Sequence, residues 1–172
     1  MNNLNNPTLT DALPQHELQM SVLMTRERAS LSATAPGGHL LTPRARGPCA
    51  AATHCSGHYA VTLSVDQVIF KEPIHVGELV TFLASINHVG RTSMEVGIRV
   101  EAQNIRQRSV RHTNSCYFTM VAIDNGKPAA VPPLPLNTDM QRCRFAAAEQ
   151  RKAQRLQAVH THRCESDDKN QN

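Results

Sequence analysis

The sequence contains no tryptophan, and its aromatic residues are four Phe and two Tyr among 172 residues. A core made from this chain must therefore be filled by aliphatic side chains, chiefly Val, Ile, Leu, Met and Ala. Hydrophobic residues make up 40% of the chain and charged residues 19%, which is typical of a globular domain rather than of a disordered chain. The length suits one ordinary domain with a sizeable core.

Long hydrophobic runs and paired cysteines are also missing. No apolar run approaches the roughly 20 residues that a membrane-spanning helix needs, and the Asn-rich residues 1–14 match neither a signal peptide nor a transit peptide. The cysteines form no CxxC pair, and an odd, scattered set predicts a reducing compartment; they are Cys49, Cys55, Cys116, Cys143 and Cys164. We therefore expect a cytoplasmic protein that does not enter a membrane.

Charge and possible metal ligands exclude two further classes of protein. The net charge is only +4. The sequence lacks the basic stripe with interleaved aromatic residues that is typical of nucleic-acid-binding proteins. The basic residues gather near the C-terminus, as expected for a solvated helix face, and a mildly positive surface also suits an anionic ligand. His54, Cys55 and His58 fit no established zinc spacing. We expect no metal and no cofactor.

The middle of the chain reads as a series of β-strands. Alternation of apolar and polar residues from Tyr59 to Val65 predicts a strand with one buried face. Residues 76–87 predict a second strand that ends in a turn at residues 88–90, and the alternation at 94–101 is the clearest in the chain. Residues 114–123 form another strand, closed by the turn signal at 124–126.

The flanks are less regular. Residues 1–15 read as a disordered lead-in, and periodicity alone leaves residues 16–25 open as strand or helix. Four prolines between Pro128 and Pro135 predict an extended linker. Thr138 or Asp139 then caps a predicted helix of about 18 residues, ending near Ala158. Antiparallel strands with one helical region before them indicate an α+β layer architecture.

Three blocks of sequence carry a family resemblance: LSVDQVIFKEPIHVGELVTF (63–82), GRTSMEVGIRVEAQNI (90–105) and RHTNSCYFTMVAIDNGKPAAVPPL (111–134). In this order they resemble the hotdog-fold acyl-CoA thioesterases of the bacterial acyl-CoA hydrolase type. The resemblance implies a curved antiparallel sheet wrapped around a central helix, in a thioesterase domain at residues 16–131. Residues 132–172 would then form a Pro-rich linker, a C-terminal helix and a polar tail.

The same resemblance implies a function and an assembly. Family members hydrolyse fatty acyl-CoA to free fatty acid and coenzyme A, and they assemble from dimers into hexamers. Gly37 and Gly38 match the Gly-Gly that opens the central helix, where backbone N–H groups polarise the thioester carbonyl; Gly-Gly alone also fits a loop. Lys71 and Arg91-Thr92-Ser93 correspond to contacts of the coenzyme A phosphates, and Asn114 to the substrate tunnel. Each of these assignments has an alternative. Lys71 could be an exposed lysine on an edge strand, residues 91–93 a solvated turn, and Asn114 a residue that forms a hydrogen bond at the start of a strand.

The family's catalytic Asn and Asp are replaced here. Ser30 stands at the Asn position and Ala45 at the Asp position, and residues 29–60 contain no acidic residue. Prolines at 43 and 48 predict that the central helix is disrupted between Pro43 and Pro48. We infer that the segment around residues 26–55 is diverged or read out of frame relative to the family. Acyl-CoA hydrolysis with doubtful activity is the leading prediction, and a non-catalytic acyl-CoA-binding or co-assembling family member is the alternative.

Overall fold

The computed structural model describes residues 16–26, 37–66 and 68–168, and for residues 37–46, Ile69 and 158–168 it describes the backbone alone. The predicted disorder of residues 1–15 therefore lies outside the described residues, as does Ser30. The chain divides into two compact units, one up to Pro133 and one from Leu134 onward.

The first unit is built on an antiparallel sheet with the strand order β1-β4-β5-β6-β2. The two short strands also pair with β6: β3 with Asn114 and Ser115, and β7 with the last two residues, Ile123 and Asp124. In chain order the strands are β1 (Glu17–Leu23), β2 (Tyr59–Val65), β3 (Ile69–Phe70), β4 (Leu79–Val89), β5 (Ser93–Asn104), β6 (Ser109–Asp124) and β7 (Lys127–Pro128). Of residues 16–25, which periodicity left open as strand or helix, residues 17–23 form strand β1.

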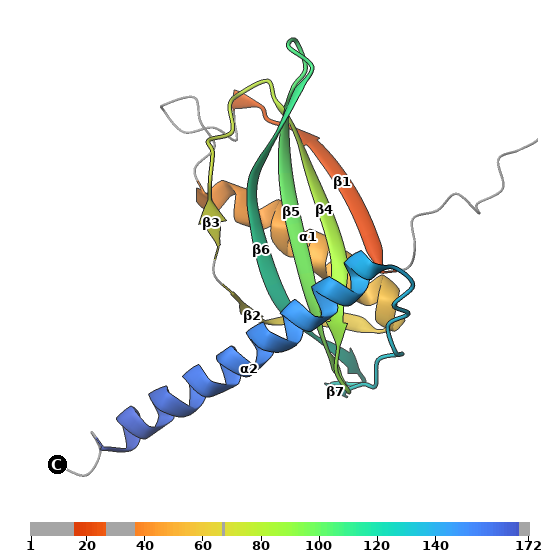
Figure 1. The fold of residues 1–172 in the computed structure, drawn as a ribbon, viewed down its shortest axis with the longest axis vertical. Coiled ribbons are helices and arrows are strands. Elements are labelled where there is room, and N and C mark those ends of the chain that lie inside the picture. The colour runs from red at the N-terminus through yellow and green to blue at the C-terminus, as the bar shows by residue number, and fades with distance from the viewer. Residues whose placement is uncertain (1–15, 27–36, 67, 169–172) are drawn as a thin grey trace, which may run out of the picture. The chain divides into compact units, whose positions relative to one another are not determined.

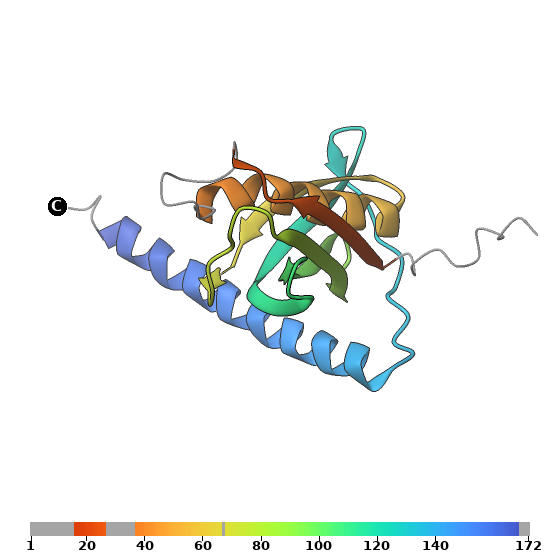
Figure 2. The ribbon, with the colours of Figure 1, turned by 90° about the horizontal axis from the view of Figure 1, so that it is seen from above.

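One helix covers one face of this sheet. Helix α1 (Gly37–Ser56) contacts β1, β2, β4, β5 and β6, and Figures 1 and 2 show the sheet curving around it. The β5 residues Met94, Val96, Ile98 and Val100 are all buried, as the alternation at residues 94–101 predicts for one face, but Glu95 and Gly97 on the other face are buried as well. This curved sheet around a central helix is the predicted α+β hotdog architecture.

The predicted break in the central helix is wrong. Helix α1 is one continuous element of 20 residues that includes both Pro43 and Pro48. An interior proline costs a helix about 3 kcal/mol because it removes one backbone hydrogen bond. Tertiary packing offsets this cost: Pro48 is fully buried, as are Ala51 and Ala52 in the next turn. Helix propensity is a weak predictor where an element is held against a sheet.

Small residues bring α1 close to the sheet. Gly47 is buried, and a Cβ atom at this position would lie 3.9 Å from Cδ1 of Ile98. A larger side chain there would push the helix away from β5. Gly47, Pro48, Ala51 and Ala52, a sequence that looks unsuited to a helix, are thus buried residues of α1 where it meets the sheet.

Strand β2 differs from its prediction. The alternation from Tyr59 to Val65 predicts a buried apolar face, but Tyr59, Val61, Leu63 and Val65 are all exposed, whereas Ala60 is fully buried. A register shift between Thr62 and Ser64 also interrupts the pairing with β6. The apolar residues are correctly assigned to a strand, but in the single chain they face outward.

The predicted turn at residues 88–90 is wrong at its start, because β4 continues to Val89, but the turn at residues 124–126 and the start of the second unit follow the sequence. Asn125 and Gly126 both have positive φ, 47° and 76°, as a two-residue hairpin turn requires, and they join β6 to β7. Helix α2 (Asp139–Asp168) begins at the predicted residue, and the hydroxyl of Thr138 accepts a hydrogen bond from the N–H of Gln141. The predicted end near Ala158 is wrong, because α2 continues for another ten residues to Asp168.

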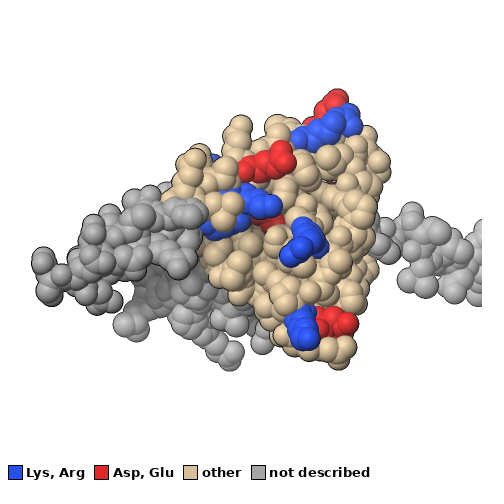
Figure 3. Space-filling view, turned by 90° about the horizontal axis from the view of Figure 1, so that it is seen from below, with Lys and Arg blue, Asp and Glu red and all other residues tan. Residues whose placement is uncertain are grey.

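Charged residues are dispersed on the face shown in Figure 3. Blue Lys and Arg side chains and red Asp and Glu side chains form small groups among uncharged residues, some with both signs side by side, and no broad region has one sign. Within the described part of the chain, no helix is both long and apolar enough to span a bilayer.

Candidate functional site

Helix α1 runs across the sheet from the side where β3 lies, as Figures 1 and 2 show. Its C-terminal end is tied to the start of β2: the Ser56 hydroxyl donates to the carbonyl of Ala52, and the N–H of His58 donates to the Ser56 hydroxyl. Since Tyr59 pairs with Ile123, this end of α1 lies beside the C-terminal part of β6. Gly47, near the middle of the helix, faces Ile98. The N-terminal half of α1 is therefore directed toward the part of β6 near Asn114.

The start of α1 is the element that the family resemblance singles out. Gly37 and Gly38 are its first two residues, so their N–H groups have no carbonyl partner within the helix. Figures 1 and 2 both place this end of α1 on the side of the sheet where β3 lies. Ala45 follows Gly37 by eight residues, about 12 Å along the helix axis. It belongs to the same helix, but its methyl group cannot accept or donate a proton.

Asn114 is a fully buried polar residue of β6, on the side of the sheet where β3 pairs. It lies in β6 between Val100 of β5 and Phe70 of β3. Its side chain is 0% exposed, and neither its Oδ1 nor its Nδ2 has a hydrogen-bond partner among the described residues. Cross-strand partners point to the same face, so Asn114 shares the helix-facing side with Val100 and, two positions along, with Ile98. A buried amide without partners is destabilising unless something else fills its bonding capacity.

Lys71 lies next to Asn114 along the sheet edge. Its backbone N–H donates to the carbonyl of Thr113 at 2.8 Å, and its side chain is exposed. The structure therefore brings two of the sequence-predicted site residues, Lys71 and Asn114, into one region.

Arg91, Thr92 and Ser93 lie elsewhere. They form the tight connection between β4 and β5, closed by a 2.7 Å hydrogen bond from the N–H of Gly90 to the carbonyl of Ser93. Ser93 pairs with Val121, whereas Val100 pairs with Asn114. Seven residues of strand, roughly 23 Å at about 3.3 Å each, separate these two levels of the sheet. Within one chain, Arg91 and Lys71 therefore cannot hold the same phosphate group.

An ion-pair network that the sequence reading missed holds residues 72–78 against β6. Arg111 donates to Glu72 at 2.9 Å and to both carboxylate oxygens of the buried Glu78 at 2.6 and 2.8 Å. Hydrogen bonds to Glu72 and then to Glu78 raise the pKa of Arg111 above its ordinary value. The signal in the sequence was a pair of acidic residues in an otherwise apolar loop, opposite the Arg of the RHTNS block.

The cysteines and histidines make no metal site among the described residues, where no group of three His, Cys, Asp or Glu side chains could hold an ion. Burial raises the pKa of the Cys55 thiol, which makes it a poor nucleophile at neutral pH. Cys116 is fully buried on β6 and fills the core beside Ile98.

Comparisons with known proteins agree on one family. A model of the thioesterase superfamily matches residues 46–109. Protein VdlD of Helicobacter pylori is 45% identical over 145 residues, which cover 84% of this chain and 83% of VdlD.

Among solved structures, an apo-hexameric acyl-CoA thioesterase superposes with a TM-score of 0.80 at 29% identity, covering 83% of this chain and 92% of that one. The acyl-CoA hydrolase of Staphylococcus aureus, solved with butyryl coenzyme A, coenzyme A and coenzyme A disulfide, gives a TM-score of 0.77 at 25% identity and covers 87% and 94%. The chain belongs to the thioesterase superfamily and has the hotdog fold of its acyl-CoA thioesterases.

Proposed function

We propose that the chain binds fatty acyl-CoA and hydrolyses the thioester to a free fatty acid and coenzyme A, more slowly than relatives that carry the catalytic Asn and Asp. The observation that carries the proposal is the continuous helix α1, which begins at Gly37-Gly38 and packs on the sheet of a thioesterase-superfamily fold. An intact helix keeps the part of the machinery that depends on backbone atoms rather than on side chains.

The chemistry follows from the start of this helix. Free N–H groups at a helix N-terminus, together with the helix dipole, favour negative charge at that point. They stabilise the oxyanion that forms when a water oxygen attacks the thioester carbonyl carbon. The C–S bond then breaks, the acid retains the water oxygen, and coenzyme A leaves as a thiolate that takes up a proton. Donors placed where charge develops supply a large share of the rate in such reactions.

The missing element is activation of the water. A positioned carboxylate that accepts the proton of the attacking water contributes about 10²- to 10⁴-fold to the rate. Ala45 occupies that position in α1, and a methyl group cannot take this role. The serine at position 30, which lies outside the described residues, replaces a carboxamide that positions water or substrate. Slow turnover is therefore the expected behaviour.

Binding of coenzyme A requires more than one chain in this proposal. Lys71 and Arg91-Thr92-Ser93 are the proposed phosphate contacts, yet they lie at different levels of the sheet, so two subunits would supply one complete site. Strand β2 supports such an assembly, because it is an edge strand that exposes Tyr59, Val61, Leu63 and Val65. An exposed apolar edge is a site of association. The proposed assembly is a homo-oligomer built from dimers, with a hexamer as in the similar solved structure.

The proposed setting is the cytoplasm, in fatty acid metabolism. Cys49, Cys55, Cys116 and Cys143 are all free thiols in the structure, which supports a reducing compartment. The proposal assigns the reaction to a thioesterase domain at residues 16–131, with residues 132–172 as an appended segment.

A second candidate function is acyl-CoA binding without turnover, alone or within mixed assemblies with an intact relative. The alanine at position 45 favours it, because it removes the proposed base while leaving α1 and the sheet intact.

One pair of measurements separates the two functions. Loss of thioester absorbance is followed for acyl-CoAs from short to long with purified protein; direct absorbance is preferable to a thiol-reactive dye, because the chain has five cysteines of its own. Calorimetric titration with a non-hydrolysable thioether analogue of acyl-CoA measures binding. Binding with measurable hydrolysis supports the thioesterase, binding with no hydrolysis supports the second candidate, and no binding contradicts both.

A further inference from the structure

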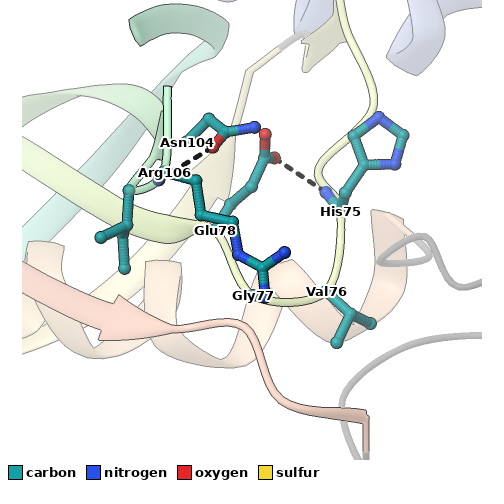
Figure 4. Close-up of a pocket in the computed structure, with 7 residues that line it drawn as sticks. His75, Val76, Gly77, Glu78, Asn104 and Arg106 are labelled. Carbon is teal, nitrogen blue, oxygen red and sulfur yellow. Dashed lines mark hydrogen bonds between the residues drawn. The ribbon is translucent and has the colours of Figure 1, made fainter. Parts of the chain in front are cut away.

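A pocket of about 390 Å³ lies at the end of the sheet where β5 turns into β6. Its walls come from two segments, residues 75–78 before β4 and residues 104–106 at the end of β5. This volume falls within the roughly 300–1,000 Å³ of pockets that hold small molecules. Figure 4 shows the lining residues arranged around the pocket.

The acidic residue in this wall is already neutralised. Glu78 accepts two hydrogen bonds from Arg111, and its Oε2 also accepts the backbone N–H of His75 at 2.9 Å. Its side chain is 7% exposed. The carboxylate of Glu78 is therefore saturated by protein donors, and its charge contributes little to the pocket.

The guanidinium of Arg106 is placed differently. Figure 4 shows it reaching into the pocket, between Glu78 and Val76. Among the side chains that the structure describes, no acidic group forms an ion pair with Arg106. Its backbone is fixed, because Oδ1 of Asn104 accepts the N–H groups of both Arg106 and Gln107 at 3.1 Å. The pocket thus contains a positioned cation whose charge no described acidic residue balances.

We propose that this pocket is a binding site for a small ligand with an anionic group, a carboxylate or a phosphate, held by the guanidinium of Arg106. A guanidinium presents paired N–H donors that match both groups in a two-point geometry. Val76 and the exposed Ile105 provide an apolar wall beside the cation, so a ligand with a short alkyl portion fits better than a bare inorganic ion.

This site is separate from the proposed phosphate contacts of Arg91-Thr92-Ser93. Those residues precede or begin β5, whereas Asn104 is its last residue, and the eleven residue steps from Ser93 to Asn104 span roughly 36 Å at about 3.3 Å each. The inference does not rest on thioester hydrolysis, so it stands or falls independently of the proposed function.

The test compares two arginines of one hairpin. Arg106 lines the pocket, whereas Arg108, two residues further on, does not; both are exposed, so replacing either with glutamine removes the same charge without disturbing the core. Wild type, Arg106→Gln and Arg108→Gln are titrated calorimetrically, as full-length protein at constant ionic strength. The probes are inorganic phosphate, butyl phosphate, acetate and butyrate.

We expect saturable, millimolar binding of at least one butyl probe to wild type, weakened about tenfold or more in Arg106→Gln and unchanged in Arg108→Gln. The class that binds more tightly, phosphate or carboxylate, then identifies the anionic group. Absence of saturable binding for all four probes overturns the site. Equal loss in both variants also overturns it, because that result would reflect the general charge of the hairpin.

Discussion

A single nitrogen of Arg111, Nη2, donates to both carboxylate oxygens of Glu78, at 2.6 and 2.8 Å. Glu78 is buried and precedes β4, whereas Arg111 lies on β6, so the pair joins segments 33 residues apart. Burying a carboxylate is tolerated only when its charge is matched by hydrogen-bonded partners.

Replacing Arg111 with methionine should lower the free energy of unfolding by about 2–3 kcal/mol, because it leaves the Glu78 carboxylate buried without its cation. Urea denaturation measures the change. Glu72→Gln is the matched control, since Glu72 pairs with the same arginine but is half exposed, and it should change the unfolding free energy by less than about 1 kcal/mol. Similar losses in both variants would contradict the assigned importance of Glu78.

Gly97 and Asn87 are packed closely against each other. A Cβ atom at Gly97 would lie 2.4 Å from Nδ2 of Asn87, closer than any real contact. Gly97→Ala should therefore destabilise the fold by about 1–3 kcal/mol through overpacking. In a double-mutant cycle with Asn87→Ala, the second change should remove most of the added cost, because it deletes the clashing atoms. Strictly additive losses would show that the clash is relieved elsewhere.

The prolines of α1 give a third prediction. Pro43 lies inside the helix and cannot donate to the carbonyl of His39. Pro43→Ala restores that donor and should raise the free energy of unfolding by up to about 3 kcal/mol, seen as a melting temperature several degrees higher. Pro132→Ala, in the extended segment, is the control and should leave stability unchanged or slightly lower. No stabilisation by Pro43→Ala would argue against a continuous helix.

Replacing Asn114 should raise the stability of the fold and weaken substrate binding. Asn114→Leu replaces an amide that lacks described partners by an apolar side chain of similar volume, so we expect stability to rise by about 1–3 kcal/mol. If Asn114 contacts substrate as proposed, affinity for a thioether analogue of acyl-CoA falls in the same variant. A more stable protein with unchanged affinity would restrict Asn114 to a structural role, and lower stability would reveal a partner within the fold.

Much of the fold could be predicted from the sequence because long, regular alternation is a strong signal. Met94 to Val100 and the Asp124-Asn125-Gly126 turn identified the sheet and one of its hairpins. Two of the errors, in α1 and in β2, share one physical origin, which is tertiary contact. Pro48 is tolerated because the sheet holds α1, and β2 directs its apolar residues outward, where a partner is proposed to cover them.

Less of the candidate site than of the fold could be predicted from the sequence. The resemblance named Gly37, Gly38, Lys71 and Asn114, and the structure groups Lys71 with Asn114 because β3 pairs with β6 beside them. Propensity and spacing could not show that Arg91 lies at another level of the sheet, since that depends on strand register. The pocket around Arg106 was missed for the same reason: residues 75–78 and 104–106 are distant in sequence and meet where β4 begins and β5 ends.

The most direct test of the central claim is thioester hydrolysis by wild type and by the Ser30→Asn/Ala45→Asp variant, measured by absorbance over a panel of acyl-CoAs. Because α1 is continuous, restoring the two side chains should restore a working site, despite the two prolines. The account predicts slow or undetectable turnover in wild type and a gain of about 10²- to 10⁴-fold in the variant. Turnover that is already rapid in wild type and gains nothing from the substitutions would contradict it.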